Sequence, residues 1–233
     1  MNPRVLAWGV HLFTGLGLVC AGLMAIRIFD ADYRGAFFLM LVATLIDALD
    51  GTLARKARVS KVLPGFDGRR LDDIVDFQTY TSLPLLLMWR AGLAPGAWLI
   101  APLLASAYGF CRKQAKTDDG YFLGFPSYWN IVAFYAYFLR PPEAVAIVAV
   151  TALSVLTFVP SRYLYPSQPG PLNRLTVILA MPWTVMLVAI CAGKEALVLP
   201  SLYFPVFYMA SSFWVSLRTA PRQTPCDTNP DAP

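Results

Sequence analysis

Apolar stretches of close to twenty residues follow one another along most of the chain, separated by short polar connections. Stretches of this length match the hydrocarbon thickness of a bilayer when they are helical. The pattern therefore predicts an all-α integral membrane protein with about eight transmembrane helices. The expected spans are Leu6–Phe29, Ala36–Ala54, Leu71–Trp89, Ala97–Cys111, Phe125–Leu139, Glu143–Pro160, Arg174–Ala192 and Ala196–Leu217.

Composition supports the membrane class. The chain of 233 residues is 57% hydrophobic and 14% charged, whereas about a quarter of the residues in a soluble domain are charged. One membrane domain is expected over residues 1–218, and the segment 160–173, with its four prolines, is expected to be a loop. The proline-rich, polar residues 219–233 predict a disordered tail.

Basic residues indicate the orientation of the spans. With the amino terminus inside, fourteen of the nineteen lysines and arginines fall on the cytoplasmic side, which is the bias that membrane proteins show. Both termini are therefore expected in the cytoplasm. This bias and anionic lipid headgroups account for the net charge of +5 without nucleic-acid binding. The five basic residues expected outside are Arg27, Arg34, Arg90, Arg140 and Lys194.

Four acidic residues interrupt the apolar pattern near the cytoplasmic ends of the second and third spans. Asp47 and Asp50 are three residues apart, and Asp72 and Asp76 are four apart, so each pair shares one helix face. A basic connector, 56–70, joins the two helices. We expect it to be short and amphipathic and to lie along the lipid headgroups. Two antiparallel helices could then direct four carboxylates toward one site.

Grouped carboxylates repel one another, and each costs about 2.5–3.5 kcal/mol at the centre of a membrane helix. Divalent cations would offset both costs, and oxygen ligands favour hard ions such as Mg²⁺ or Mn²⁺. The neighbouring residues suit a phosphate-bearing ligand. Gly51 and Gly68 permit close approach, Ala54 keeps the helix face narrow, and Arg55 can bind a phosphate.

Structural roles for the same residues remain open at this point. Asp50 and Gly51 could form a turn, and Asp72 or Asp73 could cap the third span, with Asp73 the better candidate. The acids could also form a buried ion-pair network with basic neighbours. Those neighbours would be Arg55, Arg69 and Arg70.

The arrangement Asp-Gly-x-x-Ala-Arg, beginning at Asp50, followed by Gly-x-x-x-Asp-x-x-x-Asp, beginning at Gly68, resembles the signature of the CDP-alcohol phosphotransferase family. Members of this family are membrane enzymes that join a CDP-linked donor to an alcohol and release CMP. The spacer after Arg55 has twelve residues, which resembles the bacterial branch that makes phosphatidylcholine. The resemblance extends over about Ala7–Leu139.

The resemblance implies a set of roles by position. Two divalent cations, Mn²⁺ or Mg²⁺, would be held by Asp47, Asp50, Asp72 and Asp76, and Asp76 would also be the general base. The donor would be CDP-diacylglycerol. The protein would be a homodimer of the bacterial inner membrane with its active site facing the cytoplasm. The CDP site would be lined by Gly51, Ala54, Arg55, Gly68 and Thr14.

Choline is the favoured acceptor alcohol, and its quaternary ammonium needs aromatic faces with a carboxylate nearby. Tyr80 is the first candidate because it follows Asp76 by four residues. The sole histidine, His11, could contact the nucleotide or an acid, or could pack in the core. Further acceptor candidates are Tyr121, Trp129, Asp118 and Arg112, and then Tyr108, Phe122, Tyr128 and Asp119, although most of these aromatics fit an interfacial belt equally well.

Two positions depart from the pattern of that branch. Phe77 stands where a tyrosine is usual, and the fourth span ends in Gly-Phe-Cys-Arg112 in place of a run with tyrosines and an acid. These changes favour an acceptor that carries a carboxylate or phosphate, such as serine or glycerol 3-phosphate. A reading of another class is a non-enzymatic divalent-cation-binding membrane protein or transporter that uses the same acids.

Overall fold

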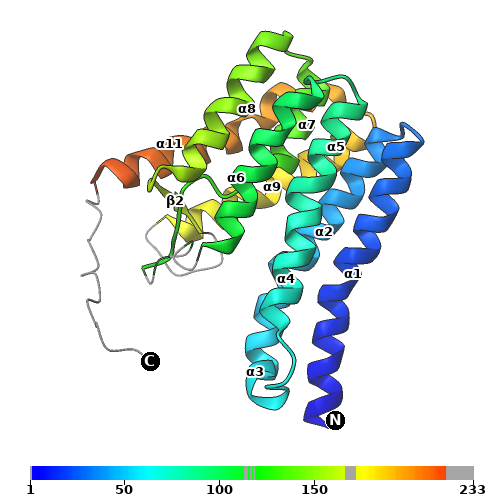
Figure 1. The fold of residues 1–233 in the computed structure, drawn as a ribbon, viewed down its shortest axis with the longest axis vertical. Helices are drawn as coiled ribbons and strands as arrows, with labels where there is room; N and C mark the ends of the chain where they lie inside the picture. The colour runs from blue at the N-terminus through cyan, green and yellow to red at the C-terminus, as the bar shows by residue number, and fades with distance from the viewer. Residues whose placement is uncertain (1, 113–114, 116, 118, 166–171, 219–233) are drawn as a thin grey trace.

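The computed structural model describes residues 2–112, 115, 117, 119–165 and 172–218. The predicted tail and Asp118 lie outside the described residues. The described residues are mostly helical and include one small two-stranded sheet (Figure 1). Its long elements are α1 (Pro3–Phe29), α2 (Tyr33–Ala57), α4 (Gly68–Asp76), α5 (Leu83–Arg90), α6 (Ile100–Cys111), α7 (Trp129–Leu139), α8 (Glu143–Phe158), α9 (Asn173–Cys191) and α11 (Tyr203–Arg218). The short elements are α3 (Val59–Val62), the π-helical segment Phe77–Ser82, the 3₁₀ turns Gly96–Leu99 and Glu195–Leu197, α10 (Val198–Ser201), β1 (Tyr121–Leu123) and β2 (Arg162–Leu164).

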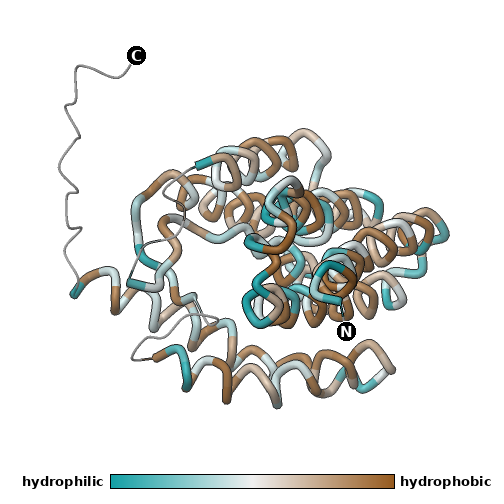
Figure 2. Tube along the Cα trace, turned by 90° about the horizontal axis from the view of Figure 1, so that it is seen from below, coloured by the Kyte–Doolittle hydropathy of each residue, from teal (hydrophilic) through white to brown (hydrophobic). Residues whose placement is uncertain are grey.

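Length and composition of the helices confirm the membrane class. Four stretches are long and apolar enough to cross a bilayer, namely Pro3–Phe29, Tyr33–Ala57, Asn173–Cys191 and Glu195–Arg218. The shorter apolar helices are Gly96–Cys111, Trp129–Leu139 and Glu143–Phe158. Figure 2 shows the helices hydrophobic over most of their length. The count of eight spans stays a prediction.

The amino-terminal helices form a layer that carries the acidic residues. Helix α1 packs along α2 and also contacts α4, and the three lie side by side in Figure 1. Gly17 makes the α1–α4 contact close, because a Cβ atom there would lie 2.3 Å from Cγ1 of Val75. Because α2 and α4 both pack on α1, their acidic faces meet.

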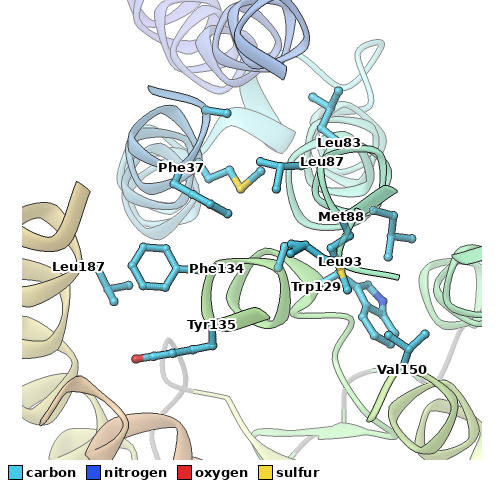
Figure 3. Close-up of a cluster of buried hydrophobic side chains, with 14 of the residues drawn as sticks. Phe37, Leu83, Leu87, Met88, Leu93, Trp129, Phe134, Tyr135, Val150 and Leu187 are labelled. Atoms are coloured by element: carbon cyan, nitrogen blue, oxygen red, sulfur yellow. The ribbon is translucent and has the colours of Figure 1, made fainter. Parts of the chain in front are cut away.

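An apolar core joins this layer to the rest of the chain (Figure 3). Phe37 of α2 packs edge-to-face on Phe134 of α7, with ring centroids 5.3 Å apart. Burying aromatic side chains of this size contributes strongly to packing. Further buried members of this core are Leu87, Trp129, Val150 and Leu187.

The third predicted span begins earlier than expected, and its cap differs. Helix α4 starts at Gly68, and the side chain of Asp67 accepts a hydrogen bond from the backbone N–H of Arg70. Asp67 is therefore the N-cap, and the prediction that Asp73 caps this helix is wrong. The turn at Pro64 and Gly65 separates α3 from Asp67, whose side chain then bonds to the first turn of α4.

The fifth predicted span is shorter than expected, because α7 begins at Trp129 and not at Phe125. Gly124 and Ser127 have positive φ angles of 85° and 58°, and such conformations cannot continue a helix. Pro126 stands between them. The non-helical backbone before α7 still forms a hydrogen bond, because Gly124 N–H donates to the Ser161 carbonyl at 2.8 Å.

The segment 160–173, predicted as a loop, contains strand β2. It pairs with β1 in an antiparallel sheet in which Phe122 lies opposite Tyr163. The outer edge of β2 is bound by side chains of α11, because the backbone N–H of Leu164 donates to the Ser212 hydroxyl at 3.2 Å. Tyr208 of the same helix donates to the Leu164 carbonyl at 2.9 Å. No sequence pattern indicated this strand, because it is three residues long and lies among prolines.

Candidate metal and substrate site

Three of the four predicted acids come together where α2 and α4 meet. One carboxylate oxygen each from Asp47, Asp50 and Asp72 lies within 4.8 Å of the others. Asp50 is buried, with 5% of its surface exposed, while Asp47 and Asp72 are half-buried. Asp50 and Gly51 are continuous with helix on both sides, since α2 runs to Ala57. They therefore do not form the turn considered above.

Asp50 is oriented by a residue of α1. The Thr14 hydroxyl donates to Oδ2 of Asp50 at 2.8 Å, and both side chains are buried. Thr14 was expected to contact the nucleotide, and the structure places its hydroxyl on a carboxylate. Partners of this kind fix the direction of a metal ligand.

Asp47 is oriented in the same way from the other side. The Tyr80 hydroxyl donates to Oδ2 of Asp47 at 2.7 Å. Tyr80 belongs to the π-helical segment that follows α4 and is 9% exposed. Tyr80 thus reaches the acids, as its spacing from Asp76 suggested, but its hydroxyl is bonded to a carboxylate.

Asp76 is the last residue of α4, at the junction with the π-helical segment. The carboxylates of Asp76 and Asp47 both interact electrostatically with the hydroxyls of Tyr80 and Tyr128. Asp76 therefore lies beside the three-carboxylate cluster without belonging to it. A single turn of π-helix within a helix is rare and is frequent at functional sites.

The signature residues of α2 leave space beside the cluster. Apart from the backbone of α2 itself, a Cβ atom added at Gly51 would meet one atom of the described residues within 4 Å, Nη1 of Arg55 at 3.4 Å. Arg55 is exposed, and its guanidinium donates to the Thr52 hydroxyl at 3.1 Å. Arg69 and Arg70 are exposed as well. These positions suit arginines that meet a ligand from the aqueous side better than a buried ion-pair network.

Gly68 was expected to line the CDP site, but in the structure a side chain of the protein itself lies against it. A Cβ atom there would lie 2.4 Å from Cε1 of His11. The space beside Gly68 is thus filled by the imidazole of His11, which packs against the start of α4. The sequence singled out both residues but held no signal that they touch.

The remaining acceptor candidates are spread over the molecule. Trp129 is fully buried in the core, and its indole N–H donates to the Ser106 hydroxyl at 2.8 Å, which is a packing role. Tyr121 is buried in β1, beneath the guanidinium of Arg162 at 5.5 Å. Arg162 also pairs with Asp119 at 2.6 Å. The Thr117 hydroxyl contributes most to lowering the pKa of the Asp119 carboxyl, and Arg162 also lowers this pKa.

The other candidates lie at the end of α6 and in the sheet. Arg112 is half-buried directly after α6, and Tyr108 packs on Phe158 with ring centroids 4.9 Å apart. Phe122 packs on Tyr165 at 4.3 Å. These ring contacts agree with the packing alternative that was left open for the aromatics.

The two departures from the expected pattern lie next to each other. Phe77 packs edge-to-face on Phe110, with ring centroids 5.5 Å apart. Phe110 belongs to the Gly-Phe-Cys-Arg run that ends α6. The two changes therefore form one apolar contact between the π-helical segment and α6.

The donor set fits a hard divalent cation. Three like charges within 4.8 Å repel one another unless a counter-charge lies among them. All the ligand atoms are carboxylate oxygens, which suit Mg²⁺, Mn²⁺ or Ca²⁺. The fold and this cluster define a class, a polytopic α-helical membrane protein with an acidic centre between two of its helices.

Comparison with known proteins identifies the family. The chain is 40% identical to the phosphatidylcholine synthase of Legionella pneumophila over 76% of this chain and 72% of that protein. It is 32% identical to the phosphatidylcholine synthases of Borreliella burgdorferi, over 90% of this chain and 94% of that protein, and of Pseudomonas aeruginosa, over 94% and 96%. No protein-family model matches the chain. The chain belongs to the bacterial phosphatidylcholine synthase family.

Proposed function

We propose that this protein transfers the phosphatidyl group of CDP-diacylglycerol to choline, which yields phosphatidylcholine and CMP. The observation that carries the proposal is the Asp47, Asp50 and Asp72 cluster, formed by signature residues of a chain that aligns over most of its length with phosphatidylcholine synthases.

The carboxylates of the cluster would hold two Mn²⁺ or Mg²⁺ ions, with Asp76 as a fourth ligand. Such ions, when bound, neutralise the diphosphate and stabilise the leaving phosphate. Thr14 and Tyr80 orient the two carboxylates of α2 through their hydroxyls. Gly51, Ala54 and Gly68 would line the CDP site; the open space beside Gly51 supports this role, and at Gly68 the ligand would meet the His11 imidazole that fills the adjoining space.

Asp76 would take the proton from the choline hydroxyl as the oxygen attacks the β-phosphorus. Its place at the end of α4, near the Tyr80 and Tyr128 hydroxyls, puts a carboxylate beside the cluster but outside its three-oxygen group. Arg55 would bind a phosphate from the exposed side. CMP then leaves with the electron pair of the broken P–O bond.

The choline ammonium would meet the ring faces near Asp76. Tyr80 and Tyr128 have ring centroids 6.2 Å apart, and Tyr128 and Tyr208 5.7 Å apart. Both the aromatic faces and the carboxylates attract a quaternary ammonium. Trp129 is buried in the core and bonded to Ser106, so we propose no direct acceptor contact for it, and contacts of the acceptor with Arg112, Tyr121 and Asp118 stay predictions.

We place the protein in the bacterial inner membrane as a homodimer, with eight passes, both termini in the cytoplasm and the acidic centre facing the cytoplasm. The distribution of basic residues supports this orientation. The ends of α1 and α2 that adjoin the basic connector then lie at the cytoplasmic surface.

A panel of acceptors tests the proposal. Purified protein is supplied with CDP-diacylglycerol, Mn²⁺ and choline, serine, inositol, glycerol 3-phosphate or ethanolamine, and CMP and lipid product are measured. We expect CMP release that depends on both choline and the metal. Transfer only to serine or glycerol 3-phosphate would refute choline as the acceptor and would support an anionic acceptor bound by Arg112. Metal-dependent ion flux in liposomes without any transfer would support a transporter.

A further inference from the structure

The only histidine of the chain is buried at the centre of an aromatic group. His11 lies on α1 and is 7% exposed. Its ring lies 4.4 Å from the ring of Phe66 and 5.8 Å from that of Trp8, measured between centroids. These contacts come from α1 and from the connector before α4, so the imidazole is held by two separate segments.

The start of α4 fixes the ring from a third direction. A Cβ atom at Gly68 would lie 2.4 Å from Cε1 and 3.0 Å from Nδ1 of His11. Only glycine lets the imidazole approach so closely. Position 68 is thus matched to His11, which explains in this chain why the signature glycine is needed there.

Packing alone does not account for a histidine at this position. Its Nε2 atom is buried and has no hydrogen-bond partner among the described residues. Leaving such an atom unsatisfied is unfavourable, and a phenylalanine would fill the same space without that cost. A ligand that binds beside Nε2 would remove the penalty.

The position of His11 along α1 indicates which part of a bound ligand would lie next to Nε2. Thr14, one turn further along α1, bonds to Asp50, so His11 lies one turn nearer the end of the bundle that carries α3. Val10, next to His11, packs in a cluster that includes Ala54. His11 is therefore level with the part of α2 beyond the carboxylates.

We propose that Nε2 of His11 hydrogen-bonds to the nucleoside of CDP-diacylglycerol. The inference rests on the proposed function, which puts the diphosphate at the carboxylates and so directs the nucleoside toward the α3 end of the site. A neutral imidazole nitrogen can donate or accept, and both cytosine and ribose offer partners of either kind. The diphosphate makes no contact with His11.

Two substitutions separate the nitrogen from the ring. His11→Phe keeps the contacts with Phe66 and Trp8 but removes Nε2, and His11→Gln puts an amide near the place of that atom. Binding of CDP is measured by calorimetry on the solubilised full chain with Mn²⁺. We expect His11→Phe to weaken CDP binding about tenfold, the change that corresponds to about 1.4 kcal/mol. His11→Gln is expected to keep most of the affinity, and the KM for choline to stay within twofold.

Further ligands identify the contact. If Nε2 bonds to the base, His11→Phe weakens the binding of CDP more than that of UDP. If Nε2 bonds to the sugar, the substitution weakens the binding of CDP more than that of 2′-deoxy-CDP. Equal weakening of CDP and inorganic pyrophosphate would overturn the nucleoside contact. Unchanged CDP binding in His11→Phe, with a choline-active wild type, would overturn the inference alone. Wild-type protein that binds CDP through His11 but does not transfer to choline would refute only the acceptor. A uniform loss of thermal stability, CDP affinity and choline KM would show that His11 is structural.

Discussion

Two hydroxyl groups hold the carboxylates of the acidic centre in place. Thr14 donates to Asp50 and Tyr80 donates to Asp47, at 2.8 and 2.7 Å. Each bond occupies Oδ2 of its carboxylate and limits the rotation of that side chain. A metal site built on α2 and α4 thus depends on α1 and on the π-helical segment for its orientation.

Removing the Tyr80 hydroxyl should weaken metal binding and spare the chemistry. Tyr80→Phe keeps the ring but deletes the bond to Asp47. Loss of such a partner typically costs about 10–100-fold in metal affinity. We expect the Mn²⁺ concentration for half-maximal activity to rise by about that factor, with activity restored at saturating Mn²⁺. Tyr33→Phe is the control, because its hydroxyl bonds to the Arg90 carbonyl away from the cluster. An unchanged Mn²⁺ requirement would contradict the role of Tyr80.

Asp76 and Asp73 provide a matched pair of carboxylates on one helix. Asp76→Asn should lower phosphatidyl transfer by about 100-fold or more, since a general base contributes about 10²–10⁴-fold. Asp73→Asn should leave transfer nearly unchanged, because Asp73 is neither the cap of α4 nor a member of the cluster. CMP release and the temperature of unfolding are measured on both variants. Full activity in Asp76→Asn would exclude Asp76 as the base.

At this scale the sequence predicted the acids but not their partners. Carboxylates in an apolar stretch are anomalous by themselves, so Asp47 and Asp50 stood out without a structure, and Asp72 was identified by its spacing of four residues from Asp76. Thr14 and Tyr80 were noticed, but their hydrogen bonds depend on how α1 and the π-helical segment pack on α2. No local pattern contains that information.

At the scale of elements, the close contact between α1 and α4 controls how near the two acidic helices come. Gly17 of α1 faces Val75 of α4, whereas Gly22 on the same helix has no atom within 4 Å of a Cβ added to it. The first glycine is a packing requirement and the second is not.

Gly17→Ala should separate α1 from α4. Overpacking a tight contact costs about 1–3 kcal/mol, and α4 would move away from Thr14 and Asp50. We expect a lower unfolding temperature in detergent and a clear loss of transfer activity. Gly22→Ala should match the wild type, and adding Val75→Ala to Gly17→Ala should restore part of both properties. Failure of this double variant to recover would show that the contact with Val75 is not the cause.

Helix ends were predictable where residues that terminate helices flank the apolar stretch, and not elsewhere. The ends of α8 and α9 agree with the predicted spans within two residues. The π-helical segment after Asp76 carries no sequence signal, because its residues are equally compatible with an α-helix. The late start of α7 was signalled by Gly124 and Pro126, but the apolar pattern outweighed these residues.

On the scale of the whole molecule, α7 raises the question of how a short helix lies in a membrane. Its eleven residues extend about 16 Å, and the hydrocarbon core is about 30 Å thick. Non-helical backbone at this depth is tolerated when it is buried in protein and hydrogen-bonded. The backbone N–H of Phe125 donates to the Leu156 carbonyl at 3.1 Å, and Phe125 is buried. The non-helical start of this pass is therefore covered by α8 and the sheet.

This arrangement predicts the side of the membrane on which the α7–α8 connection lies. If only the four long stretches cross, residues 58–172 stay in the cytoplasm, whereas eight passes put Glu143 outside. In a chain without its native cysteines, Glu143→Cys should react with a membrane-impermeant maleimide in spheroplasts that retain an intact inner membrane. Lys194→Cys should react in either topology, and Lys61→Cys should react in neither until the membrane is permeabilised. Protection of Glu143→Cys beside a labelled Lys194→Cys would reject eight passes, because α5, α6, α7 and α8 would then not cross the bilayer.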